Sequence, residues 1–311
     1  MHVPVLLEES VSYLNASRGG VMMDCTFGGG GHAKEILKKM AVPGRLIALD
    51  RDMEAINRGL ELVAEYPNLK VLHRNFTELK EVAVEEGVFG RVNGILADLG
   101  TSMFQLKNPG RGFSFSTDGP LDMRMDTSTG PTAADILNTY PEEELLRVFR
   151  DYGEERYARR IAREVVARRK GTPYKNTLVF AHQVEDIYGG RRGRIHPATR
   201  CFQALRIAVN EELESLPRFL ESALEVLAEG GRLVVISFHS LEDRIVKNFF
   251  RDKAQNCICP PSQARCTCGG NNAQVHVLTR KVIRPSQWEV ERNPASRSSR
   301  LRAAEKLRVP S

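Results

Sequence analysis

The sequence predicts a doubly wound α/β fold that is interrupted by a mainly helical inserted domain. Over the first third of the chain, short apolar runs alternate with amphipathic segments, as in successive βα units. A glycine-rich turn follows the first apolar run. More than a hundred residues with helical patterns then separate the fourth strand from the fifth, which is too long for a loop. Together these features indicate half of a parallel sheet, an insertion, and a return to the sheet.

The elements follow from local patterns in chain order. Strands are expected where short apolar runs end in turn residues or acids, at 21–24, 46–50, 69–72 and 92–97. Helices are expected where apolar residues recur every three or four positions, at 33–40, 54–66 and 78–86. The fourth strand carries Asp98 at its carboxyl end.

The helical insertion is expected from about Gly110 to Asn210. Within and just beyond it, helical spacing covers 141–149, 156–169 and 202–216, and the fifth strand, 233–237, follows the Gly230-Gly231 turn. We therefore expect a core formed by 1–109 and 211–311, with a substrate-recognition domain at 110–210. In the tail, 275–282 predicts one or two strands, whereas 299–307 fits a strand or a helix.

Composition favours a soluble protein with a polyanionic partner. The chain has 311 residues, 41% of them hydrophobic, and no apolar run long enough to span a membrane. We expect a cytoplasmic protein that does not contact a membrane. The net charge of +6 is concentrated in 187–210, with five arginines and no acid, and in 280–308, with nine basic and three acidic residues. Such clusters suit nucleic acid, although a solvated basic surface explains the charge equally well.

The turn Asp24-Cys25-Thr26-Phe27-Gly28-Gly29-Gly30-Gly31-His32 predicts a nucleotide-like ligand. Glycines between a first strand and a first helix let the backbone approach a ligand, and Asp50 ends the second strand, where an acid can hold ribose hydroxyls. A nicotinamide fold would fit the same description. Because His32 and Lys34 occupy the helix start, the spacing does not match a phosphate-binding G-x-G-x-x-G turn. The turn instead resembles the acid-x-G-x-G turn of methyltransferases, which indicates S-adenosyl-L-methionine. Taken singly, Asp24 and His32 are also explained as helix-start residues.

Longer motifs carry a resemblance to a known family. They comprise His2-Val3-Pro4-Val5-Leu6-Leu7, Asp98-Leu99-Gly100, Arg111-Gly112-Phe113-Ser114-Phe115, Pro120-Leu121-Asp122-Met123-Arg124-Met125, Gly153-Glu154-Glu155, His196-Pro197-Ala198-Thr199-Arg200, Phe202-Gln203-Ala204-Leu205-Arg206 and Ser237-Phe238-His239-Ser240-Leu241-Glu242-Asp243-Arg244. In this order they resemble the bacterial 16S rRNA cytosine-N4 methyltransferase family (RsmH, also called MraW) over nearly the whole chain.

The resemblance implies a class I S-adenosylmethionine methyltransferase with a Rossmann-like sheet. It implies methylation of N4 of a decoding-site cytosine, nucleotide 1402 of 16S rRNA, on naked RNA or in the small ribosomal subunit. The implied cofactor contacts are Gly30, Gly31, His32, Asp50, Phe76, Asp98 and Gln105. The family's Val-Ser-Ser-x-Gln-Leu-Asp stands here as 101–107, Thr-Ser-Met-Phe-Gln-Leu-Lys, which keeps the glutamine. A core position is the competing interpretation of Phe76.

Two residues are candidates for catalysis. The exocyclic amine of cytosine is a poor nucleophile, and a carboxylate accepting its N–H would stabilise developing positive charge. Asp98 is placed for that role, although a role in cofactor binding alone fits as well. His239 follows the fifth strand and could orient the base. Capping of the next helix by Ser240, with acids in its first turn, is the alternative.

Substrate contacts are expected from aromatic and basic side chains. A target base must leave its stack and is commonly received by aromatic residues, while arginines grip phosphates. The candidates are Arg111, Phe113, Phe115, Arg124, Arg200, Arg206 and Phe238. Asp243, which follows the fifth strand with His239, could orient the base.

Cysteine usage suggests a reducing compartment and no metal. The chain has six cysteines, too few for a disulfide scaffold at this length. Cys257-x-Cys259 and Cys266-x-Cys268 raise the question of zinc, but two-residue steps are less typical than C-x-x-C. Free thiols in a flexible loop are the preferred interpretation.

Three other functions stay open. A small-molecule N-methyltransferase of the same fold would lack a use for the arginine-rich segments. A non-catalytic RNA-binding protein would not bind the cofactor, and a nicotinamide oxidoreductase would bind a different one. A homodimer is also an open expectation.

Overall fold

The computed structural model describes residues 4–191, 193, 196–260, 263 and 265–308. Within them the chain divides into two compact units, one formed by Met1–Gly100 with Leu213–Ser311 and the other by Thr101–Glu212. The second unit thus begins nine residues before the expected 110 and ends two after 210. Four residues of the sequence motifs and basic segments, His2, Val3, Arg192 and Arg194, lie outside the described residues.

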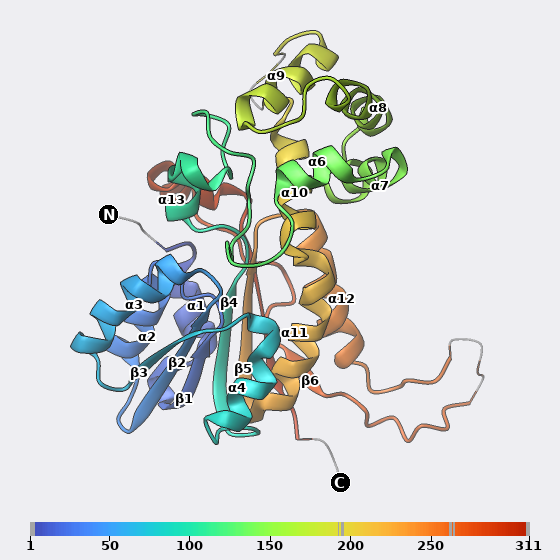
Figure 1. Ribbon diagram of the computed structural model, residues 1–311. Helices are drawn as coiled ribbons and strands as arrows, with labels where there is room; N and C mark the ends of the chain where they lie inside the picture. Colours follow the sequence, from blue (N-terminus) through green and yellow to red (C-terminus); the bar gives the residue numbers. More distant parts are fainter. Residues whose placement is uncertain (1–3, 192, 194–195, 261–262, 264, 309–311) are drawn as a thin grey trace. The chain divides into compact units, whose positions relative to one another are not determined.

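The first unit, the sheet unit, is built on one seven-stranded sheet in the order β3-β2-β1-β4-β5-β7-β6 (Figure 1). Its strands are β1 (Gly20–Asp24), β2 (Gly44–Asp50), β3 (Leu69–His73), β4 (Val92–Asp98), β5 (Leu227–Ser237), β6 (Val275–Val277) and β7 (Arg300–Lys306). The first five pair in parallel, and β7 runs antiparallel between β5 and β6. The order reverses between β1 and β4, the switch point at which doubly wound sheets bind ligands. The predicted α/β fold class is confirmed.

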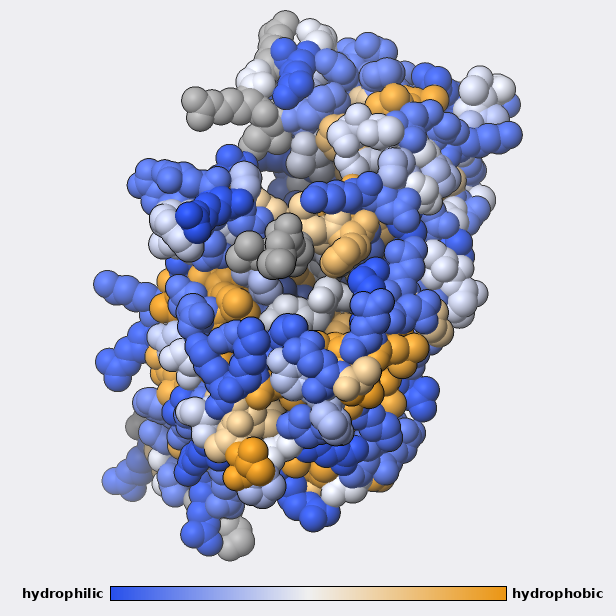
Figure 2. All heavy atoms as spheres, turned by 90° about the vertical axis from the view of Figure 1, so that its left-hand side faces the viewer, coloured by the Kyte–Doolittle hydropathy of each residue, from blue (hydrophilic) through white to orange (hydrophobic). Residues whose placement is uncertain are grey.

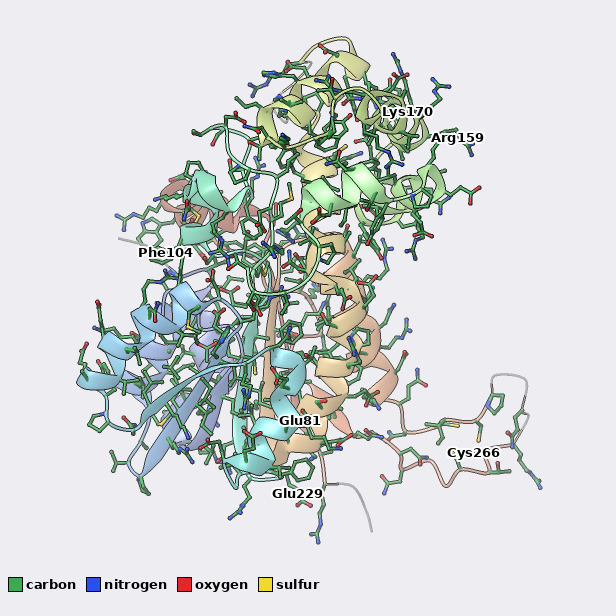
Figure 3. All side chains as sticks on the ribbon, in the orientation of Figure 1. Glu81, Phe104, Arg159, Lys170, Glu229 and Cys266 are labelled. Carbon is green, nitrogen blue, oxygen red and sulfur yellow. The ribbon has the colours of Figure 1, made fainter. Side chains whose placement is uncertain are left out.

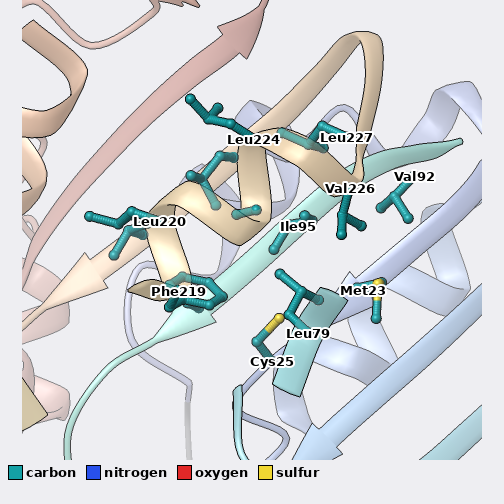
Figure 4. Packing of buried hydrophobic residues seen from close by; sticks show 14 of the residues in the cluster. Met23, Cys25, Leu79, Val92, Ile95, Phe219, Leu220, Leu224, Val226 and Leu227 are labelled. Atoms are coloured by element: carbon teal, nitrogen blue, oxygen red, sulfur yellow. The ribbon is translucent and has the colours of Figure 1, made fainter. Parts of the chain in front are cut away.

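Two layers of helices cover this sheet. They are α1 (Leu7–Leu14), α2 (Gly31–Lys39), α3 (Met53–Glu65), α4 (Leu79–Glu85), α11 (Glu212–Val226) and α12 (Ser240–Lys253). The short helix α13 (Gln287–Arg292) has no buried residue. Because side chains alternate along a strand, Met23 packs into one apolar cluster with α4, α11 and α12, and Met22 packs into the other with α1, α2 and α3. Figure 4 shows the first cluster, with Phe219 and Leu220 of α11 lying over Ile95.

The outer helices present polar faces. The side turned to the viewer in Figure 2 is mostly hydrophilic, with apolar residues in scattered patches. Met53 and Leu60 of α3 are the large apolar residues exposed on that helix, at 50% and 60%. Isolated apolar residues of this kind are normal on protein surfaces. Among the described residues, no helix is both long and apolar enough to cross a membrane.

The second unit, the helical unit, has a core of its own. Its helices are α5 (Met103–Lys107), α6 (Ala133–Thr139), α7 (Glu142–Arg147), α8 (Ala158–Arg169), α9 (Thr177–Tyr188) and α10 (Thr199–Asn210). Large aromatic side chains fill the core, with Phe180 in ring contact with Phe149, Tyr174 and Phe202. The sequence patterns missed α9, whose apolar residues are spread around the helix.

The structure corrects one sequence expectation and decides another that was left open. The helix expected at 202–216 is two helices, because Glu211 adopts φ of 49°, a left-handed conformation that ends α10 before α11 begins. The segment 299–307, left as strand or helix, is the strand β7, whose Leu301 and Ala303 are buried while its backbone pairs with β5.

Candidate functional site

The glycine turn joins β1 to α2, and at several of its positions no residue other than glycine would fit. Gly28 and Gly30 have φ of 54° and 74°. A Cβ on Gly30 would lie 2.7 Å from Cζ of Phe27, and one on Gly31 would lie 2.2 Å from Cγ of Pro4. The turn therefore presents bare backbone at the carboxyl edge of the sheet.

Asp50, at the end of β2, holds this turn in place. Its carboxylate accepts hydrogen bonds from the N–H of Gly28 at 2.7 Å and from the N–H of Asp52 at 2.8 Å. Burial raises the pKa of Asp50, while these two backbone donors act in the opposite direction. A carboxylate can accept about four hydrogen bonds, so Asp50 retains acceptor capacity for a ligand.

Asp24 and Asp98 end the strands on the two sides of the switch point. Asp24 is 1% exposed, and its Oδ1 accepts the N–H of Thr26 at 3.1 Å. Burial raises the pKa of Asp24 to about 7, and the charge of Asp50 adds to the effect. Burial also raises the pKa of Asp98 well above its usual range, helped by Asp24 and Glu242. Within the described part of the chain, Asp24 Oδ2 and Asp98 Oδ1 have no hydrogen-bond partner.

His32 begins α2 beside these acids. It is 6% exposed, its Nε2 lies 3.0 Å from the carbonyl oxygen of Val5, and its Nδ1 lies 3.7 Å from Oδ2 of Asp98. The carbonyl of Val5 can only accept, so the hydrogen bond places a proton on Nε2. The ring thus links the N-terminal segment to the end of β4.

The arrangement fits S-adenosylmethionine. Three carboxylates, of which Asp24 and Asp98 each have an oxygen without a hydrogen-bond partner, form a site that a cationic group would stabilise, and the cofactor carries a sulfonium and an ammonium. The bare glycine backbone leaves room for close approach. Sequence reasoning missed Thr26, whose Oγ1 accepts the N–H of Asp98 at 2.6 Å and so connects the glycine turn to β4.

The other two expected cofactor residues lie in different units. Phe76 follows β3 and packs edge-on against Phe219 of α11, with ring centroids 5.0 Å apart, so it is also part of the core packing. Gln105 lies in α5 of the helical unit, is 5% exposed, and exchanges capping-box hydrogen bonds with Ser102.

Three of the four expected phosphate-binding arginines are buried or paired with a carboxylate inside the helical unit. Arg111 is 6% exposed and donates to the carbonyls of Arg124 and Met125. Arg124 pairs with Asp122 at 2.8 Å. Arg206 makes a bidentate pair with Glu212, at 2.9 and 2.7 Å. Arg200 is exposed and donates to the carbonyl of Glu154.

The expected aromatic contacts also differ in exposure. Phe113 is 8% exposed and belongs to the core of the helical unit. Phe115 is partly buried, with its ring 4.8 Å from that of His196 and 4.5 Å from that of Phe202. Phe238 of the sheet unit is partly buried beside Gly100, where a Cβ would lie 3.3 Å from its ring.

His239 is the N-cap of α12, where the sequence suggested Ser240. Its Nδ1 accepts the N–H of Glu242 at 3.4 Å, and Glu242 accepts the N–H of Phe238 and of His239 at 2.9 and 3.3 Å. Asp243 pairs with Arg302 of β7 at 2.6 Å. The buried Glu242 was missed as a site residue, although an acid three residues after a cap is a recognisable sequence signal.

Comparisons with known proteins identify the family of this chain. The model of the "MraW methylase family" matches residues 1–307. "Ribosomal RNA small subunit methyltransferase H" of Carboxydothermus hydrogenoformans is 49% identical over 308 residues, covering 98% of each chain. The protein of the same name from Syntrophobacter fumaroxidans is 51% identical over 312 residues, covering 99% of this chain and 97% of the relative.

Among solved structures, an rRNA methylase from Streptococcus thermophilus aligns with 99% of this chain and 100% of its own, at 10% identity and a TM-score of 0.41, which is too low to add to the assignment. The sequence relatives and the family model span nearly the whole chain, and they confirm the predicted resemblance and cofactor class. The chain belongs to the MraW methylase family, and it is an S-adenosylmethionine-dependent methyltransferase.

Proposed function

We propose that this protein transfers a methyl group from S-adenosylmethionine to N4 of a cytosine in the RNA of the small ribosomal subunit, at the decoding-site nucleotide 1402 of 16S rRNA. The observation that carries the proposal is the set of orphaned, buried carboxylates beside the glycine turn at the sheet's switch point. The name shared by the relatives, ribosomal RNA small subunit methyltransferase H, supports the choice of substrate.

We assign the cofactor to the carboxyl edge of the sheet. The cofactor supplies a methyl group activated by its positively charged sulfur. The residues of the sheet unit that would hold it are Gly30, Gly31, His32, Asp50, Phe76 and Asp98. Gln105 stays a prediction that follows from the family resemblance. Asp50 would accept hydrogen bonds from ribose hydroxyls, and Asp24 and Asp98 would balance positive charge.

Asp98 is our candidate for the catalytic group. A neighbouring cation favours its carboxylate form against the effect of burial. Its orphaned Oδ1 can then accept an N–H of the target amine, which strengthens the nucleophile, and can hold the proton that the methylated nitrogen releases. His239 acts one step away, as a positioning residue that caps α12 and fixes Phe238 and Glu242.

For the substrate, we keep the exposed Arg200 and the partly buried Phe115 and Phe238 as the leading contacts. Arg111, Phe113, Arg124, Arg206 and Asp243 would act mainly by shaping their units, given their burial or pairing. A cytoplasmic location and a homodimer stay predictions, to be checked by cell fractionation and by light scattering.

The test uses small subunits isolated from cells that lack the protein. Purified protein and labelled S-adenosylmethionine should methylate the 16S rRNA, and nucleoside mass spectrometry should find N4-methylcytidine at one position. Glu81→Gln, on the exposed surface of α4, serves as the matched control and should retain full activity. Binding of the cofactor without methylation of RNA or subunits would refute the proposal, as would methylation of a different atom.

A further inference from the structure

The segment between α12 and β6, residues 254–274, has no helix or strand among its described residues, and these residues extend away from the sheet (Figures 1 and 3). Its base is tied by the N–H of Gln274, which donates to the carbonyl of Lys253 at 2.7 Å, and by Asn272, which donates to the carbonyl of Asn256 at 3.1 Å. Most of its described residues are exposed, so burial of apolar surface does not order it. A loop of this length needs another source of stability.

The segment brings its cysteines together. The cysteine cluster comprises Cys257, Cys259, Cys266 and Cys268, and all four sulfur atoms lie within 4.8 Å of one another. Cys266 is labelled in Figure 3, far along the extended segment. The Sγ atom of Cys266 lies 3.7 Å from that of Cys257 and 3.6 Å from that of Cys268, and the last two lie 3.8 Å apart. A disulfide would need about 2.05 Å.

These separations match the edges of a tetrahedron around one metal ion. A Zn–S bond is about 2.3 Å long, and tetrahedral angles then place the sulfur atoms about 3.8 Å apart. Tetrahedral coordination by four sulfur atoms is typical of zinc or of iron–sulfur centres, and one ion fills a site of this size.

Backbone donors support thiolate ligands. The N–H of Ile258, between the first two cysteines, donates to Sγ of Cys268 at 3.4 Å. The N–H of Thr267, between the last two, donates to Sγ of Cys259 at 3.4 Å. A backbone N–H within each pair thus donates a hydrogen bond to a sulfur atom of the other pair. The two-residue spacing, which argued against zinc in the sequence, therefore does not prevent a compact site.

We propose that the cysteine cluster binds one Zn²⁺ ion, which holds the segment between α12 and β6 in a fixed conformation. Binding joins four thiolates to the ion and releases the thiol protons to solvent, so no oxidant or reductant is required. The inference replaces the expectation of free thiols, and it does not depend on the proposed methylation.

The primary test measures metal content. The full-length protein, purified under reducing conditions without chelator, should contain one zinc per chain by inductively coupled plasma mass spectrometry. The double variant C266S/C268S should lose zinc about tenfold or more, because two ligands are removed. Cys201→Ala is the matched control, since Cys201 is buried in α10, and it should keep its zinc.

A second measurement tests the proposed role. Arg265 is exposed beside Cys266, so trypsin should cleave there rapidly in the double variant or in chelator-treated protein, and slowly in the zinc form. Thermal unfolding of the sheet unit should be unchanged, which shows that the variant folds. Protein without zinc, with iron in its place, or with zinc retained in C266S/C268S would overturn the proposal, as would paired disulfides found by thiol counting under anaerobic conditions.

Discussion

The carboxylates at the edge of the sheet and the arginines of the helical unit are both charged groups with little exposure, yet they differ in whether a protein partner compensates their charge. Asp24 and Asp98 have oxygens without a hydrogen-bond partner among the described residues. Arg124 and Arg206 are each matched by a carboxylate of their own unit. Leaving a buried charge unmatched costs stability, so it persists where a ligand supplies the partner. Arginines that are already paired with a carboxylate contribute mainly to the stability of the fold rather than to ligand binding.

The largest expected effect is on catalysis. Asp98→Asn removes the carboxylate that we assign to the amine of the substrate, and methylation of small subunits should fall about 100- to 1,000-fold. Thermal stability should not fall, because the variant removes an unmatched charge. Glu81→Gln is the control. Activity within threefold of the parent would show that the orphaned oxygen has no role in the reaction.

Arg206→Ala tests the paired side of the comparison. Loss of the bidentate pair removes a cation from the nearly buried Glu212, which should lower the free energy of unfolding by about 3 kcal/mol. Denaturant titration measures this. The exposed Arg200→Ala should change stability by less than about 0.5 kcal/mol. If Arg206→Ala instead weakened RNA binding and left stability intact, the arginine would be a phosphate contact, as the sequence first suggested.

Asp24→Asn tests how much the ionised, unmatched carboxylate of Asp24 destabilises the fold, because this destabilisation should depend on pH. The pKa of Asp24 is raised from 3.8 to about 7, so the folded chain holds this proton more tightly than the unfolded chain. Stability from this group is therefore lost as pH rises from about 4 to about 7. The variant should be more stable than the parent by about 4 kcal/mol at pH 8 and equal to it near pH 4. Urea unfolding across this range checks it; a difference that does not vary with pH would contradict it.

The smallest effect concerns His239. Replacement by alanine removes the cap of α12 and should cost about 1 kcal/mol, measured by thermal unfolding. His239→Asn keeps a capping side chain, so it should restore stability and most of the methylation. Restored stability with activity still lost would give the imidazole a direct part in the reaction.

Much of the cofactor edge could be predicted from sequence because its signals are local. Glycines with positive φ, acids that end β1, β2 and β4, and apolar runs of strand length all act within a few residues. This placed Gly30, Asp50 and Asp98 at one edge of a sheet. Tail segment 299–307 could not be assigned, because its strand forms only by pairing with β5 and β6.

The sequence by itself determined the βα repeat and the glycine turn with its acids, since each depends on neighbours along the chain. Tertiary structure alone decided which charges are matched. It paired Arg302 with Asp243, made His239 rather than Ser240 the cap, and gathered two cysteine pairs into one cluster. A charge or a thiol acquires its role from partners that lie far away in sequence, and only the folded chain brings those partners within bonding distance.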